Sequence, residues 1–115
     1  MAVVTVGAQA GIWKELGQST PANNSDTALY TAPSTGKGAI NIVVSVANVT
    51  TVSLYRLWVD KAAAGTHFYK RFDVSLAAAA YDDVFIGGIE PADIIYVRTS
   101  VASALTFTAN GVALG

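Results

Sequence analysis

The sequence predicts an all-β protein, an antiparallel β-sandwich or jelly roll of about seven or eight strands. The main observation is residues 38–55, the longest run without a charged residue, in which apolar side chains recur at every second position. Ile40, Ile42, Val44 and Val46 fall on one face of this run, as in a half-buried strand. The second observation is that short segments rich in β-branched and aromatic residues alternate with turn residues along the rest of the chain.

A membrane-spanning helix is excluded for residues 38–55, because such a helix needs about 20 predominantly apolar residues. Polar side chains such as Asn41, Ser45 and Asn48 interrupt the run too often. The alternation breaks at residues 47–50 and then resumes, which predicts a hairpin of strands 39–47 and 51–59.

The chain divides into two parts of different character. Residues 1–27 predict an N-terminal arm or edge segment that contains a polar loop, and residues 28–115 predict the sandwich domain. The alanine-rich residues 76–80 are too few for a stable helix and predict a loop. Residues 87–93 predict another loop, and Asn110-Gly111 predicts a turn or bulge. Besides the hairpin, we expect strands at 27–31, 67–74, 84–86, 94–99 and 105–109, with 112–114 closing the chain.

Composition narrows the classes of partner. Of the 115 residues, 52% are hydrophobic and only 13% are charged, so part of the surface is expected to be buried in an oligomer or against a partner. The net charge is −1 and there is no basic cluster, which argues against nucleic-acid binding. Cysteine is absent, so there is neither a disulfide framework nor a thiolate site. The N-terminus lacks the basic region of a secretion signal.

No group of residues predicts chemistry. His67 is the only histidine, and no G-x-S-x-G nucleophile motif occurs, so a structural role is expected for it. The acidic pairs Asp82/Asp83 and Glu90/Asp93 match neither an EF-hand loop nor an RTX repeat and are interpreted as turn-forming acids. We therefore expect no enzymatic activity, no metal and no cofactor.

Aromatic residues leave two interpretations open. A set of seven is able to line a sugar-binding face, although filling a core or an interface is the commoner use of such residues. This set is Tyr30, Tyr55, Trp58, Phe68, Tyr69, Phe72 and Tyr81. As anchors of a protein interface we predict Trp13, Tyr30 and Trp58, because Trp and Tyr dominate such anchors.

Several segments carry a resemblance to a known family. They are LYTAP at 29–33 followed by Gly36-Lys37, AINIVV at 39–44 leading to Asn48, TVSL at 51–54, EPADIIYV at 90–97 and FTANGV at 107–112. Over residues 28–114 the chain resembles a family of small bacteriophage virion proteins. Pro91-Ala92-Asp93 stands where that family usually has Ala-Gly-Asp, so a different turn is expected before the strand.

The resemblance implies a non-enzymatic phage structural protein. In this hypothesis the chain decorates the capsid surface as a cement protein, as a homotrimer bound between capsomers of the major capsid protein. Residues 1–27 fall outside the resemblance, and a capsid-binding role for this arm is inferred from its position alone. It would be made in the host cytoplasm and located in the virion. The alternative hypothesis is a tail or fibre accessory module that binds host carbohydrate, which requires an exposed aromatic platform with neighbouring Asp and Asn side chains. Neither hypothesis requires a membrane or a nucleic acid.

Overall fold

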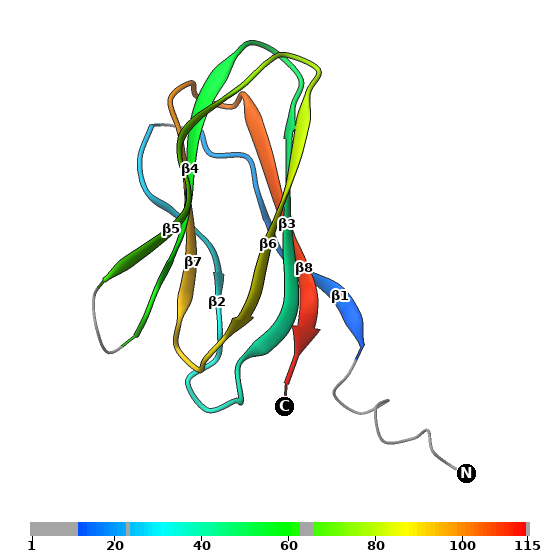
Figure 1. Cartoon of the computed structure of the whole chain (residues 1–115), viewed down its shortest axis with the longest axis vertical. Coiled ribbons are helices and arrows are strands. Elements are labelled where there is room, and N and C mark those ends of the chain that lie inside the picture. Colours follow the sequence, from blue (N-terminus) through cyan, green and yellow to red (C-terminus); the bar gives the residue numbers. More distant parts are fainter. Residues whose placement is uncertain (1–11, 23, 63–65, 115) are drawn as a thin grey trace.

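The computed structural model describes residues 12–22, 24–62 and 66–114, and these residues form two antiparallel sheets that face each other (Figure 1). Sheet A contains, in spatial order, β1 (Trp13–Ser19), β8 (Leu105–Ala113), β3 (Ala39–Asn48) and β6 (Tyr81–Ile89). Sheet B contains β2 (Thr27–Thr31), β7 (Ile94–Thr99), β4 (Ser53–Asp60) and β5 (His67–Leu76). The predicted all-β sandwich is confirmed. No helix in the described ranges is long and apolar enough to cross a membrane.

The strand order identifies the sandwich as a jelly roll. The first strand pairs with the last (β1 with β8), and the next pairs are β2 with β7, β3 with β6 and β4 with β5. This nested pairing is that of a chain folded once on itself and then rolled into two sheets. Local sequence patterns did not distinguish a jelly roll from an immunoglobulin-like sandwich, because both need the same alternation in each strand.

The core lies between the two sheets and is filled by alternate residues of the central strands. Ile42, Val44 and Val46 of β3 belong to one buried cluster with Phe107 of the neighbouring β8 and Leu57 of β4 in the other sheet. Ile40 does not belong to it and is exposed, contrary to the prediction. The register shifts between Ile40 and Val43, where Asn41 has a φ of 55°, so a β-bulge turns Ile40 out of the core.

The predicted hairpin of residues 39–59 is wrong. β3 lies in sheet A and β4 lies in sheet B, so the connection at 49–52 arches from one sheet to the other. Asn48 stabilises the arch: its Nδ2 donates to the carbonyls of Thr51 (2.7 Å) and Leu76 (2.8 Å), and its Oδ1 accepts from the backbone N–H of Thr50 (3.1 Å). A hairpin and an arch both connect two strands with a short polar turn. The arch is favoured because it lets the two strands pack their apolar faces into one core between the sheets.

Two further strand boundaries differ from the prediction. Residues 87–89 continue β6 instead of forming a loop, and β8 runs through Asn110-Gly111 without a turn. A Cβ at Gly111 would lie 2.9 Å from Ile42 Cγ1 and 3.1 Å from Leu16 Cδ1. This glycine therefore allows close packing opposite the β3 bulge, and it does not turn the chain. Residues 77–80 form the loop between β5 and β6 that the sequence predicted.

The N-terminal part lies partly outside the described residues. Within them, β1 is an edge strand of sheet A, paired with β8. A Cβ at Gly17 would overlap the carbonyl oxygen of Leu29, so β1 and β2 approach closely at this edge of the sandwich. The arm predicted for residues 1–27 includes 1–11, which the structure does not describe, and its role stays a prediction.

The turn at residues 90–93 holds an alanine in a conformation that favours glycine. Asp93 N–H donates to the carbonyl of Glu90 (3.1 Å), which closes a four-residue turn with Pro91 and Ala92 in the middle. Ala92 has a φ of 67°, in the left-handed region. This is the position at which the resembling family has glycine, and a Cβ here is strained.

We expect Ala92→Gly to stabilise the protein by about 0.5–1 kcal/mol, because relief of the left-handed strain exceeds the entropy cost of glycine. Chemical denaturation followed by tryptophan fluorescence measures this change. As the matched control, Ala47→Gly changes an exposed strand residue that is not among those with positive φ, and should destabilise the protein by about 0.5–1 kcal/mol. If both variants were more stable than the native protein, or both less stable, the explanation would be contradicted.

Candidate functional site

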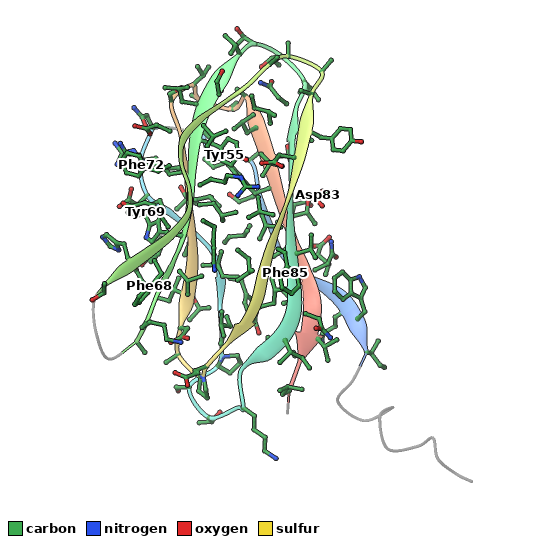
Figure 2. All side chains as sticks on the ribbon, viewed as in Figure 1. Tyr55, Phe68, Tyr69, Phe72, Asp83 and Phe85 are labelled. Atoms are coloured by element: carbon green, nitrogen blue, oxygen red, sulfur yellow. The ribbon has the colours of Figure 1, made fainter. Side chains whose placement is uncertain are left out.

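The outer face of sheet B carries a row of aromatic side chains across three strands. Tyr96 of β7, Trp58 of β4 and Tyr69 of β5 are direct cross-strand partners, so their side chains point to the same side. The Trp58 and Tyr96 rings are stacked, with centroids 5.5 Å apart, and Tyr69 packs on Trp58 at 5.4 Å. Figure 2 shows Tyr69 and Phe72 on the side of β5 away from the other sheet. The row gives sheet B an aromatic outer surface.

This row continues along the edge strand β5. His67 lies 5.7 Å from Trp58, and the Phe72 ring meets Tyr69 edge to face at 4.8 Å. We call Trp58, His67, Tyr69, Phe72 and Tyr96 the aromatic strip. Tyr69 and Phe72 are 42% and 53% exposed, whereas Trp58 is only 2% exposed beneath its neighbours. The strip thus has a buried floor and an accessible outer edge.

Trp58 has an unusual polar feature. Its indole Nε1–H is buried and finds no hydrogen-bond partner among the described residues. An unsatisfied buried donor costs about 1–3 kcal/mol. Packing of the strip over Trp58 therefore carries a stability cost.

A β-bulge places two successive residues of β5 against one arginine. The register between β4 and β5 shifts between Tyr55 and Leu57, and Asp73 adopts a φ of 51° there. Arg56 consequently contacts both Phe72, with its guanidinium carbon 4.2 Å from the ring centroid, and Asp73, through Nε (2.7 Å) and Nη2 (3.2 Å). A non-glycine residue with positive φ at a bulge is strained, and such strain gathers at functional sites.

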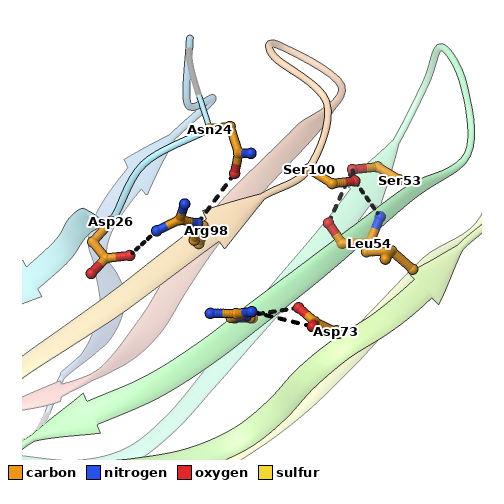
Figure 3. Close-up of polar contacts among 8 residues, drawn as sticks. Asn24, Asp26, Ser53, Leu54, Asp73, Arg98 and Ser100 are labelled. Atoms are coloured by element: carbon orange, nitrogen blue, oxygen red, sulfur yellow. Dashed lines mark hydrogen bonds and ion pairs between the residues drawn. The ribbon is translucent and has the colours of Figure 1, made fainter.

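A groove of about 230 Å³ lies beside the aromatic strip. It is lined by Asn24, Leu54, Tyr55, Arg56, Asp73, Arg98, Thr99 and Ser100. We call it the arginine groove, because Arg56 and Arg98 are direct cross-strand partners in it. Arg98 donates from Nε to Asn24 Oδ1 (3.2 Å) and from Nη1 to Asp26 Oδ1 (3.0 Å) (Figure 3).

The end of the groove is held by backbone and hydroxyl contacts. Ser100 Oγ accepts from the N–H of Leu54 (2.9 Å) (Figure 3). The N–H of Ser100 in turn donates to the Leu54 carbonyl (2.9 Å). This reciprocal pair continues the β4–β7 register beyond Thr99. These contacts hold β4 and the end of β7 together at this end of the groove.

Charge pairing in the groove changes the pKa values of both partners in the direction that favours their charged forms. The hydrogen bond from Arg56 lowers the pKa of Asp73 below its ordinary value, and burial opposes this lowering. The same bond raises the pKa of Arg56. Both groups therefore stay ionised, and the groove offers hydrogen-bond donors and acceptors side by side.

A second, partly buried polar network lies at the β5–β6 edge of the sandwich. Tyr55 donates its hydroxyl to Asp82, and Arg71 Nε donates to the same carboxylate at 3.1 Å. Burial, followed by the Asp82 hydrogen bond, raises the pKa of Tyr55 far above its usual range. Asp82 therefore lies within β6 and not in a turn, contrary to the prediction, and its carboxylate ties β4 and β5 to β6. Among the described residues, no three His, Cys, Asp or Glu side chains gather in a way that could hold a metal ion.

The residues predicted as interface anchors do not lie together. Trp13 is exposed on the edge strand β1 of sheet A, Tyr30 is half-buried against the core on β2, and Trp58 is the buried floor of the aromatic strip. Burial raises the pKa of Tyr30. Their roles in an interface stay predictions.

The sugar-binding interpretation named seven aromatic residues, and the structure gathers three of them on one face. These are Trp58, Tyr69 and Phe72. Tyr55 is in the core, and Tyr81 lies on sheet A. Sequence reasoning missed Tyr96, Arg56, Arg98 and Asp73, because only the cross-strand register brings them beside the strip. The alternation Leu54-Arg56-Trp58 in β4 was the available signal, since it shows which side chains share the outer face.

Comparison with known proteins adds little. No family model matches the sequence, and no curated protein matches it. Solved structures that resemble the fold include one described as a xylan-binding domain from CBM 22, formally x6b domain, with 15% sequence identity and a TM-score of 0.39. The match covers 90% of this chain and 87% of that one. A likeness this distant carries no weight for function.

Proposed function

We propose that this chain is a non-enzymatic carbohydrate-binding domain and that its ligand lies on the outer face of sheet B. The observation that carries the proposal is the accessible edge of the aromatic strip directly beside the arginine groove. Phe72 joins the two, because its ring packs on both Tyr69 and Arg56. A sugar ring has an apolar face of C–H groups and a rim of hydroxyls, and it needs both kinds of surface side by side.

The polar groups of the groove suit the rim of a sugar. Arg56 with Asp73, and Arg98 with Asp26 and Asn24, place donors next to acceptors. Neighbouring hydroxyls of a sugar each donate and accept, so paired Arg and Asp groups bind them with defined geometry. Exposed aromatic residues with Asp and Asn neighbours are what the carbohydrate hypothesis required of the sequence.

The test is glycan-array screening followed by titration of the best ligand. Tyr69→Ala and Phe72→Ala should each weaken binding by about tenfold, the equivalent of about 1.4 kcal/mol, because each removes an exposed stacking ring. Phe85→Ala is the matched control: Phe85 is 66% exposed on sheet A, and its removal should leave the affinity unchanged. Absence of any glycan binding by the folded protein would refute the proposal.

Capsid decoration remains a second candidate, and one observation favours it. The outer face of sheet A is formed in its middle by small, mostly uncharged side chains such as Ser45, Ala47 and Thr108, and exposed Phe85 and Tyr81 border it on β6. A flat surface bordered by aromatic rings suits contact with another protein. The homotrimer, the major capsid protein as partner and the virion location stay proposals.

Light scattering of the purified protein and co-sedimentation with phage capsids test this second candidate. A trimer that binds capsids, and that loses either property in Phe85→Ala, would assign sheet A to assembly. A strict monomer without capsid affinity would remove the candidate. Glycan binding is tested with variants on sheet B and assembly with a variant on sheet A, so the two functions are tested independently.

A further inference from the structure

The charged side chains in and beside the arginine groove stand in a particular order. Across sheet B, from the segment just before β2 to β5, they are Asp26, Arg98, Arg56 and Asp73, so the two cations are in the middle and the two acids are on the flanks. Arg56 and Arg98 are direct cross-strand partners. Like charges directly opposite each other destabilise a sheet. An order in which cations and acids alternate across the strands would avoid this repulsion, but the two cations are adjacent here.

Both guanidinium groups have N–H donors beyond those that their own ion pairs and hydrogen bonds use. Arg56 uses Nε and Nη2 for Asp73, and Arg98 uses Nε for Asn24 and Nη1 for Asp26. A guanidinium carries more N–H groups than these bonds occupy. The ion pairs are also solvent-exposed, so they contribute little to stability and yield readily to a competing anion.

On the basis of the proposed function, we infer that the ligand is an acidic saccharide whose carboxylate binds between Arg56 and Arg98. The carboxylate would neutralise the two central cations, which relieves their repulsion and adds charge-assisted hydrogen bonds. The sugar ring that carries it would then lie on Phe72, which contacts Arg56, and the next ring along would reach Tyr69. A neutral saccharide would leave the central repulsion in place.

The experiment compares acidic glycans with their own methyl esters. Glycans that contain uronic or sialic acid, each paired with its methyl ester, are titrated against the whole chain at low and high salt. We expect the acid to bind at least about tenfold more tightly than the ester, and the difference to shrink as salt rises. Arg56→Gln and Arg98→Gln should each weaken binding of the acid by about tenfold and binding of the ester by less, because the ester loses only its contacts through hydroxyls. Arg98→Lys keeps the charge but not the planar guanidinium group, so its affinity for the acid should lie between those of the native protein and Arg98→Gln.

Lys14→Gln is the matched control, because it removes one positive charge from β1 on sheet A and should leave both affinities unchanged. Thermal unfolding confirms that each variant is folded. Equal affinity of the native protein for acid and ester would overturn the acidic ligand and leave carbohydrate binding intact. Failure of every glycan to bind the folded protein would instead overturn the proposed function, and with it this inference.

Discussion

Asp93→Ala is expected to lower the free energy of unfolding by about 3 kcal/mol, because it removes a buried carboxylate and leaves its donors unsatisfied. Asp93 is only 2% exposed and accepts hydrogen bonds from Lys61 Nζ, the N–H of Ala62 (3.1 Å) and the N–H of Glu90 (2.8 Å). One side chain therefore holds the end of β4 against the turn before β7. Urea denaturation followed by tryptophan fluorescence measures the loss.

Glu90→Gln is the control for Asp93→Ala. Glu90 also pairs with Lys61 (3.2 Å), but its side chain is 77% exposed, so its removal should cost less than about 0.5 kcal/mol. Comparable losses in the two variants would show that the charge of Lys61, rather than the buried carboxylate, matters.

The same carboxylate makes stability depend on pH. Burial raises the pKa of Asp93, but the hydrogen bonds from Lys61 and from the N–H groups of Glu90 and Ala62 outweigh burial, so the pKa lies below its ordinary value. A lowered pKa in the folded state means that the contribution is complete above the unfolded pKa and is lost as pH falls through the folded one. The stability difference between the native protein and Asp93→Asn should therefore be constant above about pH 5 and shrink as the pH falls through and below about 4. A constant difference would contradict this.

Gly38→Ala is expected to destabilise the protein by at least about 3 kcal/mol. Gly38 has a φ of 86°, and a Cβ there would overlap the Ile89 carbonyl oxygen and lie 3.1 Å from Glu90 Cα. These atoms are backbone at the end of β6, so they cannot rotate away as a side chain does. Because the Gly38 carbonyl also accepts from the N–H of Leu114 (2.9 Å), movement here disturbs both neighbours of β3.

Gly87→Ala separates the two causes of this cost. Gly87 has almost the same φ, 87°, but a Cβ there would meet only the Phe85 ring at 3.6 Å, an ordinary contact. Its cost should be the backbone strain alone, about 1 kcal/mol. Thermal unfolding of the two variants side by side tests this. If both lose the same stability, strain rather than overlap explains Gly38.

The strands were predictable from sequence where alternation is uninterrupted. Residues 94–99 and 105–109 are strands as expected, since inward Val97 and Phe107 alternate with outward polar neighbours. The β3–β4 connection was mispredicted because an arch and a hairpin share one local pattern. Pairing is decided instead by which partner covers the apolar face of each strand, and that information is spread over the whole chain.

The candidate site was predictable only in part. Aromatic enrichment in residues 67–72 was visible, and it suggested either a sugar-binding face or a core. Its polar half was not visible, because Arg56, Arg98 and Asp73 are far apart in the chain and each is unremarkable alone. The bulge that brings Phe72 and Asp73 to the same arginine has no signature in the sequence, since the strained residue is an aspartate and not a glycine.

The irregularity of β5 has a consequence for the solubility of the molecule. β5 is an edge strand, and an unpaired edge normally invites the backbone of another chain to add to the sheet. The register shifts opposite residues 55–58 break the even spacing of N–H and C=O groups along it. A second molecule therefore meets no regular template there. Straightening β5 to gain stability would make the protein prone to aggregate, and would remove the contact between Arg56 and its two partners at the same time.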